Sequence, residues 1–156
     1  MLEVKNLTRK YNQFIAVNDV SFTVNKGEVI GLLGHNGAGK TTIMKMLSGF
    51  LEADSGNISF DGLSLSEHLK QIQLNLGYLP ENLPVYPEMI VADYLDYAAD
   101  LKGLKGNKKH AEIKRVIKAT DISEKLLAPI SQLSRGFKQR VGVAQAILGK
   151  PKLLIL

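Results

Sequence analysis

The sequence predicts a mixed α/β fold, and three observations in its first third support that prediction. Segments 2–8 and 20–24 alternate apolar and polar residues, as strands with one buried face do. The run "EVIGLL" (28–33) is almost continuously apolar, which is typical of a fully buried strand. It enters a glycine-rich loop, and the following "KTTIMKMLSGF" carries apolar residues at helical spacing. A buried strand, a tight loop and a helix in succession form the first half of a β-α-β unit.

The remaining elements follow in order along the chain. "KG" at 26–27 indicates a turn, and short strands are expected over 56–62 and 76–80. Gly149 and Pro151 predict a helix stop before a last strand, "KLLIL". The predicted helices cover 91–102, 108–119 and 136–148. The apolar positions expected on the helix after the loop are Ile43, Met46, Leu47 and Phe50. The helical stretch from about 84 to 149 is therefore expected to be inserted between strands of one α/β core.

Composition excludes several classes of protein. The 156 residues are enough for one domain with a sizeable core. No stretch approaches the ~18 consecutive apolar residues of a membrane-spanning helix, and the N-terminal segment lacks the apolar region of a secretory signal. The cytosol is therefore the expected compartment. With zero cysteines, disulfides and thiolate metal sites are excluded, and the three histidines have no metal-ligand spacing.

The net charge of +5 is concentrated in one segment. Residues 102–118 contain one acid, Glu112, and seven cations: Lys102, Lys105, Lys108, Lys109, Lys114, Arg115 and Lys118. The predicted helix over 108–119 places Ile113, Val116 and Ile117 on one face and its cations on another, which is typical of a solvated surface helix. No aromatic residues are interleaved with these cations, so nucleic acid is not an expected partner.

The glycine-rich loop carries the strongest functional signal. "GHNGAGKT", from Gly34 to Thr41, matches the phosphate-loop pattern G-x-x-x-x-G-K-[ST] at every fixed position. Such a loop directs backbone N–H groups at phosphate oxygens, and the following helix adds its positive N-terminal end. Lys40 is expected to reach the terminal phosphates, and the Thr41 hydroxyl to hold Mg²⁺. A simple glycine turn is the rival interpretation, but a chance match is rare, on the order of half a percent for a chain of this size.

The motif order narrows the class of nucleotide-binding protein. "NKGE" (25–28) precedes the loop and "NKKH" (107–110) lacks the Asp of a guanine-reading motif, so a GTPase is disfavoured. "GLLGHNGAGKTT" is instead followed by "LSRGFKQRVGVAQAILGKPKLLIL". With these segments the chain resembles the ATP-binding subunits of ABC transporters over essentially its whole length. It most resembles the branch that powers ABC-2-type exporters.

The resemblance implies a P-loop NTPase core of ABC type. That core has a partly parallel sheet, an antiparallel β subdomain and an inserted helical subdomain. It divides this chain into 1–83 (β subdomain and P-loop core), 84–149 (helical subdomain with the signature motif) and 150–156 (start of the Walker B strand). In the family that last strand leads into an Asp and a Glu that serve Mg²⁺ and the attacking water. The sequence is therefore expected to be an amino-terminal fragment, truncated at the Walker B strand, with little turnover of its own.

The resemblance also implies roles for individual residues. The ATP and Mg²⁺ positions of the loop are Gly34, Asn36, Gly37, Ala38, Gly39, Lys40, Thr41 and Thr42. Tyr11 occupies the position of an aromatic residue that stacks on adenine, with a half-buried structural tyrosine as the alternative. Glu81 stands where the family usually has a catalytic Gln that touches Mg²⁺ or the attacking water. The sequence departs from the family there, and an ordinary exposed loop acid is the alternative.

"LSRGFKQRV" (133–141) stands at the family signature. Ser134 and Gly136 keep the positions that contact the γ-phosphate bound on a second subunit, whereas Arg135 and Phe137 replace the usual Gly and Gln. The resemblance therefore implies a homo- or heterodimer of nucleotide-binding subunits, in which each ATP is held by both chains. The helix that follows is expected to bury Phe137, Val141, Ala144 and Leu148 on one stripe, and the alternative for this segment alone is a plain amphipathic helix.

Together these expectations describe a subunit that couples ATP hydrolysis to export. It would lie in the cytoplasm on the inner face of the cell membrane, bound to a transmembrane permease. Two alternatives stay open: a nucleotide-binding module without useful hydrolysis, and a soluble ABC ATPase that acts outside transport.

Overall fold

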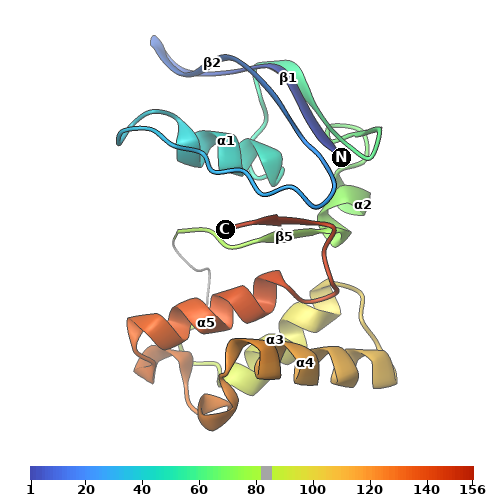
Figure 1. The fold of residues 1–156 in the computed structure, drawn as a ribbon. Helices are drawn as coiled ribbons and strands as arrows, with labels where there is room; N and C mark the ends of the chain where they lie inside the picture. The colour runs from blue at the N-terminus through green and yellow to red at the C-terminus, as the bar shows by residue number, and fades with distance from the viewer. Residues whose placement is uncertain (82–85) are drawn as a thin grey trace. The chain divides into compact units, whose positions relative to one another are not determined.

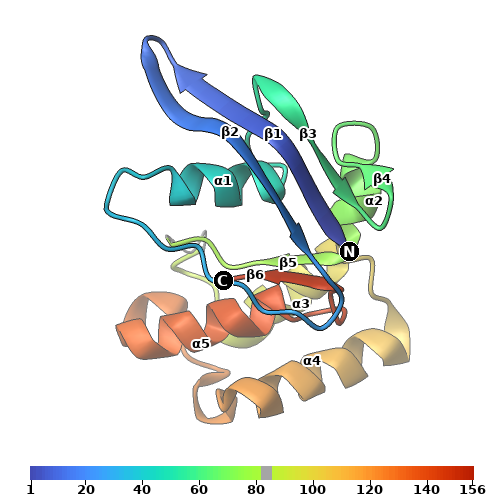
Figure 2. The same cartoon turned by 45° about the horizontal axis from the view of Figure 1, so that its top comes forward.

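A computed structural model describes residues 1–81 and 86–156, which form two compact units, Met1–Gln73 and Leu74–Leu156. Both contain strands and helices, so the mixed α/β class is confirmed (Figures 1 and 2). The predicted boundary between residues 83 and 84 lies outside the described residues. Among the described helices, none is long and apolar enough to cross a membrane.

The first unit is built on an antiparallel sheet with the strand order β2-β1-β3-β4. Figure 2 shows its three long strands side by side. The strands are β1 (Leu2–Tyr11), β2 (Phe14–Val24), β3 (Ser55–Phe60) and β4 (Leu63–Ser64). Leu2, Val4 and Leu7 of β1 are buried. The pairing register of β1 shifts between Val4 and Leu7, where Asn6 has a φ of 51°, and this bulge returns Leu7 to the buried face.

Two helices complete the first unit: α1 (Lys40–Leu47) and α2 (Leu69–Leu74). Ile43, Met46 and Leu47 are buried, as the spacing predicts. Phe50 was expected on the same stripe, but its side chain is 76% exposed. The helix ends before it, since Ser48 is the C-cap and Gly49 has a φ of 73°. The chain therefore leaves the helical period two residues before Phe50.

The prediction of a buried strand over 28–33 is wrong. The segment forms no strand, and Val29 and Leu33 are 96% and 95% exposed. A strand is stabilised by a hydrogen-bonded neighbour, and in the described part of the chain no strand pairs with this segment. The apolar run indicated a tendency to form a buried strand, but it could not supply the partner.

The second unit contains a short parallel sheet and three helices. Strands β5 (Leu76–Tyr78) and β6 (Leu153–Ile155) pair directly, with Leu76 opposite Leu153. The helices between them in the chain are α3 (Val91–Leu101), α4 (Gly106–Thr120) and α5 (Arg135–Ala146), with 3₁₀ turns at Ser123–Lys125 and Ile130–Gln132. The three predicted helices are thus confirmed within two residues at each end. β5 and β6 are neighbours although a long helical stretch separates them in the chain. The insertion of 84–149 into one α/β core stays a prediction.

The helices surround one apolar cluster, here called the helical core. Its fully buried members include Val91, Leu95, Ala99, Val116, Ile122, Ile130, Val141, Ala144 and Leu148. Gly77 of β5 is needed for close packing in this unit. A Cβ at Gly77 would lie 2.1 Å from the carbonyl oxygen of Ala146 and 3.0 Å from Pro151, so only glycine lets β5 approach the end of α5.

Candidate nucleotide-binding site

The loop from Gly34 to Thr41 leads directly into α1 and bends at two glycines. Gly37 and Gly39 have φ values of 86° and 85°, which favour glycine. Space is also restricted at Gly39, because a Cβ there would lie 2.3 Å from the carbonyl oxygen of Ala16 in β2. Backbone bends of this kind direct successive N–H groups toward a common centre, as anion sites require.

The Lys40 side chain folds back over this loop. Its Nζ donates hydrogen bonds to the carbonyl oxygens of Gly34 at 2.6 Å and His35 at 2.8 Å. An ammonium group has three N–H donors, so one remains for an anion. The His35 ring nitrogen Nδ1 contacts the carbonyl oxygen of Asn36 at 2.8 Å, which makes His35 part of the turn rather than a metal ligand.

The start of α1 adds a second source of positive potential. Gly39 is the N-cap and has no side chain to cap the helix, and the first turn contains no acidic residue. The first backbone hydrogen bond of the helix runs from the N–H of Ile43 to the carbonyl of Gly39 at 2.9 Å. The N–H groups of Lys40, Thr41 and Thr42 therefore precede the hydrogen-bonded ladder and can receive an anion. Thr41 is exposed, so its hydroxyl is accessible to a cation that accompanies such an anion.

Tyr11 ends β1 in the same unit, and its side chain is 44% exposed. The Arg9 guanidinium carbon lies 5.1 Å from the centre of its ring, a cation–π distance. Arg9 is held in place by Asp54, whose Oδ1 accepts a hydrogen bond at 2.9 Å. One face of the Tyr11 ring thus lies against Arg9, and the residue stays partly exposed.

Ser134 and Gly136 lie at the exposed start of α5 in the second unit. Ser134 is the N-cap, and its Oγ accepts a hydrogen bond from the N–H of Phe137 at 3.3 Å. The Ser134 hydroxyl hydrogen stays available to another acceptor. A Cβ at Gly136 would meet no atom within 4 Å, so this helix start is open to a large ligand or a second chain.

The predicted stripe of α5 anchors this helix start. Val141, Ala144 and Leu148 are fully buried in the helical core, and Phe137 is half-buried against it. Leu148 belongs to the stripe although α5 ends at Ala146. The periodicity therefore predicted the buried face correctly.

Glu81 is exposed and follows β5 in the second unit. It directly precedes residues 82–85, which the structure does not describe. Its proposed contact with Mg²⁺ or water therefore stays a prediction. No group of three or more metal-binding side chains occurs in residues 1–81 and 86–156.

The basic segment is less free than its sequence indicates. Lys102 donates to the carbonyl oxygen of Leu76 at 2.6 Å, and its burial lowers the pKa of its ammonium group. Lys109 forms ion pairs at 2.7 Å with both Asp96 and Asp100 of α3. The exposed cations of the segment are Lys105, Lys108, Lys114 and Lys118. Several of the predicted solvated charges thus bind within the unit.

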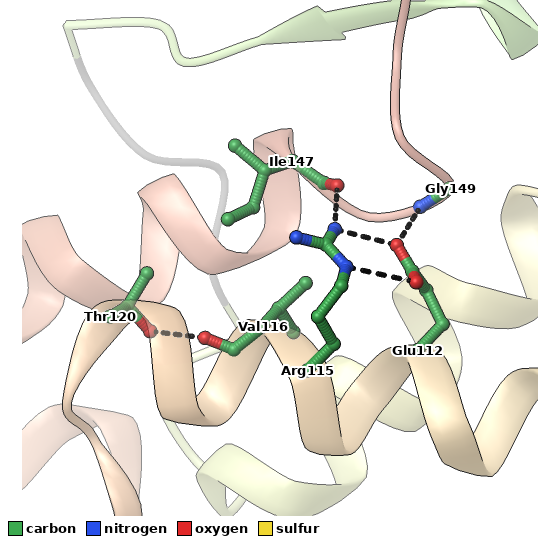
Figure 3. A network of polar contacts seen from close by, with 6 residues as sticks. All are labelled: Glu112, Arg115, Val116, Thr120, Ile147 and Gly149. Atoms are coloured by element: carbon green, nitrogen blue, oxygen red, sulfur yellow. Dashed lines mark hydrogen bonds and ion pairs between the residues drawn. The ribbon is translucent and has the colours of Figure 1, made fainter.

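The ion pair within α4 between Glu112 and Arg115 was not predicted from the sequence. Figure 3 shows the two side chains between α4 and the end of α5. Arg115 Nη2 lies 2.6 Å from Glu112 Oε1 and donates to the carbonyl oxygen of Ile147 at 2.7 Å. The signal available in the sequence was the position of Glu112, the single acid in a basic segment and three residues before an arginine.

Comparison with known proteins identifies the family. A family model described as ABC transporter matches residues 17–156. The uncharacterized ABC transporter ATP-binding protein YxlF of Bacillus subtilis (strain 168) is 40% identical over 156 residues, which are 100% of this chain and 51% of that protein. The spermidine/putrescine import ATP-binding protein PotA of Pseudomonas aeruginosa (strain UCBPP-PA14) is 35% identical over 165 residues, covering 100% of this chain and 43% of that protein.

A solved structure, described as the structure of an ATP binding subunit of an ABC transporter, has a TM-score of 0.89 and 31% identity, over 99% of this chain and 65% of that one. The chain belongs to the ABC transporter family. The ABC-type fold predicted from the loop and signature segments is therefore confirmed. The chain spans about half the length of the curated relatives it matches. Because one relative is named as an import protein, family membership alone does not fix the direction of transport.

Proposed function

We propose that this chain is the nucleotide-binding part of an ABC transporter ATP-binding subunit, which couples ATP binding and hydrolysis to export across the membrane. One observation carries the proposal: the Lys40 ammonium group folds over a loop bent at Gly37 and Gly39, at the uncapped N-terminus of α1. A flexible cation, two glycine bends and free helix N–H groups are the donors that a triphosphate requires.

Different residues of the loop bind different phosphates of the triphosphate. Backbone N–H groups from Gly34, Asn36, Gly37 and Gly39 surround the inner phosphates, and the N–H groups of Thr41 and Thr42 add the helix start. The Ala38 N–H, which here donates to the carbonyl oxygen of His35 at 3.2 Å, turns to the phosphates when nucleotide binds. Lys40 moves its ammonium group from two loop carbonyls to the terminal phosphates, a change that needs only side-chain rotation. Tyr11, which is partly exposed, stacks on the adenine.

The same site suits Mg²⁺. Mg²⁺ prefers oxygen ligands and keeps several waters and phosphate oxygens, so a single protein hydroxyl is enough to place it. Thr41 supplies that hydroxyl. Glu81 belongs to the other unit and is proposed as a second ligand on its sequence position alone. Bound Mg²⁺ would neutralise charge on the phosphates during transfer to water. Glu81 would act on the attacking water or on the metal.

The second half of each site comes from another subunit. The open start of α5 offers the Ser134 hydroxyl and the helix N–H groups beside Gly136 to an ATP held by a partner's loop. Two chains that exchange these surfaces form a closed two-fold dimer, homomeric or heteromeric. The division into 1–83, 84–149 and 150–156 belongs to this proposal, with the helical part presenting the signature.

Partners and location follow from this role. The subunit would bind a transmembrane permease and lie in the cytoplasm at the inner face of the membrane. Nucleic acid is not an expected partner, since Lys102, Lys109 and Arg115 have acceptors within their own unit.

The direction of transport has a separate test. The relative PotA is named for import of spermidine and putrescine, so labelled spermidine is a suitable probe. Cells that carry the Lys40→Ala variant should take up spermidine as fast as wild-type cells if the subunit serves export. A loss of spermidine uptake would show import instead.

Nucleotide binding is tested by titrating the native protein with a fluorescent ATP analogue. Lys40→Ala should weaken affinity on the order of 100-fold, because it removes a charge-assisted contact with the phosphates. Lys45→Ala is the matched control, since Lys45 is exposed on the last turn of the same helix and should leave affinity unchanged. Equal affinities for both variants would reject the site.

A further inference from the structure

We infer that Glu112 and Arg115 are positioning residues, which fix the end of α5 to α4 and so hold the α5 N-terminus in the direction needed to meet a partner's ATP. The inference rests on the proposed function, because that function gives Ser134 and Gly136 their ligand. The two side chains lie on α4, and neither belongs to the nucleotide-binding loop or the signature segment.

Two hydrogen bonds within α4 pair Arg115 with Glu112, and two more join this pair to the end of α5 and the turn beyond it, as Figure 3 shows. Arg115 donates from Nε to Glu112 Oε2 at 3.0 Å and from Nη2 to Glu112 Oε1 at 2.6 Å. Nη2 also donates to the carbonyl oxygen of Ile147, the C-cap of α5, at 2.7 Å. Glu112 Oε1 accepts from the backbone N–H of Gly149 at 3.0 Å. Each charge therefore binds one side chain and one backbone group.

This arrangement satisfies the end of one helix with side chains of another. The last carbonyls of a helix have no partner within the helix and are usually satisfied by the following turn or by water. At the end of α5, the carbonyl of Ile147 accepts from Arg115 as well as from the N–H of Lys150 in the following turn, and the N–H of Gly149 donates to Glu112. The end of α5 consequently cannot slide or rotate against α4 without breaking directional bonds.

Apolar packing alone would not fix this register. Val141, Ala144 and Leu148 hold α5 on the helical core, but the hydrophobic effect depends on buried area and has no preferred direction. The paired contacts of a guanidinium with a carboxylate do have a preferred geometry. The Glu112 side chain is only 11% exposed, so water competes little for the bonds of its carboxylate, although the Arg115 side chain is 36% exposed. Arg115 holds the pKa of the Glu112 carboxyl below its usual range, so the pair is ionised at neutral pH.

Because α5 is long, a small change in its tilt at the C-terminal end displaces its N-terminal end by a larger distance. The helix has 12 residues, which corresponds to a length of about 18 Å. A tilt of about 5° around the C-terminal end, which is bonded to α4, would move the N-terminal end by about 1.5 Å over that length. Misplacing a reacting or binding group by ~1 Å can cost about 100-fold in rate. Ser134 and Gly136 lie at that far end.

The test uses the native protein with the double variant Glu112→Leu/Arg115→Met. Replacing a partly buried ion pair by apolar side chains of similar size is often neutral for stability, so folding should be retained. The expected result is an ATP affinity of the individual subunit within twofold of wild type. ATP-driven self-association of the variant should require a protein concentration about tenfold or more above that of wild type. The kcat should fall about tenfold or more while KM changes little.

Lys109→Met is the matched control. Lys109 lies on the same helix, is 12% exposed and binds carboxylates of α3 rather than the end of α5. Its removal leaves Asp96 and Asp100 hydrated, since they are 52% and 58% exposed. It should leave association and kcat unchanged. Arg115→Lys keeps the charge but lacks the two guanidinium nitrogens that bind the carboxylate together, so it should give an intermediate loss of association.

Each alternative result contradicts a different statement. Wild-type association in the double variant, or in Arg115→Lys, would overturn the positioning role. A fall in melting temperature that accounts for the lost association would show a merely structural role and would overturn it as well. Gly136→Trp tests the proposed function separately, because it fills the space at the start of α5. If ATP-driven association stays intact in Gly136→Trp, the proposed contact between the α5 start and a partner's ATP is wrong, whatever the Glu112 and Arg115 variants show.

Discussion

Replacing Gly39 by alanine should damage the nucleotide loop through two separate costs. The residue has a φ of 85°, a conformation that side chains bearing a Cβ rarely adopt. The new Cβ would also lie 2.3 Å from the carbonyl oxygen of Ala16 and 3.2 Å from Val17 Cγ2. Because the first contact is with backbone, β2 or the loop itself has to move.

The two costs can be estimated separately. The left-handed conformation costs about 1–2 kcal/mol for a residue with a Cβ. Forcing an extra methyl group into occupied space typically costs about 1–3 kcal/mol more. Gly37→Ala isolates the first cost, because Gly37 has a φ of 86° but no atom within 4 Å of its built Cβ. We therefore expect Gly39→Ala to be more destabilising than Gly37→Ala by about 1–3 kcal/mol.

Urea unfolding followed by circular dichroism measures this difference, and hydrogen exchange of the β2 amides shows whether the damage is local. Gly39→Ala should accelerate exchange around Ala16, whereas Gly37→Ala should not. Equal destabilisation by the two substitutions would refute the close approach of Gly39 to β2. Unchanged β2 exchange in Gly39→Ala would refute it independently.

Two further predictions concern the second unit. Ser134→Ala removes the N-cap of α5 and should lower the free energy of unfolding by about 0.5–1 kcal/mol, with the exposed Ser131→Ala as control and urea unfolding as the measurement. Equal stability of the two variants would contradict the cap. The Glu112 carboxyl has a lowered pKa because of Arg115, so it stabilises the fold above its unfolded pKa, and this contribution is lost as pH falls through the folded pKa. Glu112→Gln should therefore make the free energy of unfolding depend less on pH in the acidic range. An unchanged pH dependence in that range would count against the ion pair.

The elements predicted best are those whose burial pattern is local. Helices α3, α4 and α5 each bury residues at helical spacing, for example Val116 between the half-buried Ile113 and Ile117. Their stop signals are also local, such as Gly149 with a φ of 77° before Pro151. Such patterns depend on neighbours three or four positions away, so the sequence displays them directly.

The prediction over 28–33 failed because a strand is not a local structure. Val29 and Leu33 have the side chains of a buried strand, but a strand forms only where a neighbouring strand pairs with its backbone. The error at Phe50 has a different cause, since spacing alone does not show where a helix ends. The bend at Gly49 ends the period of α1.

The candidate sites show the same division between local and distant information. The loop from Gly34 to Thr41 is proposed to bind phosphate through contiguous backbone, and its glycines and lysine are visible in one short segment of the sequence. Glu112 and Arg115 are also neighbours, yet their partners Ile147 and Gly149 lie more than thirty positions away, as far as 37 residues for Glu112 and Gly149. The sequence could therefore indicate that the two charges pair on one helix, but not that they bind the end of another.

That difference bears on how the signature helix acts. A motif of contiguous residues sets which groups α5 offers at its start, and Ser134 and Gly136 supply those groups wherever the helix lies. Their direction depends instead on the far end of α5, which the polar contacts of α4 fix. If the proposed function holds, a substitution on α4 should therefore alter nucleotide-dependent association without changing any residue of the loop or of segment 133–141, because recognition requires correct groups in the correct direction.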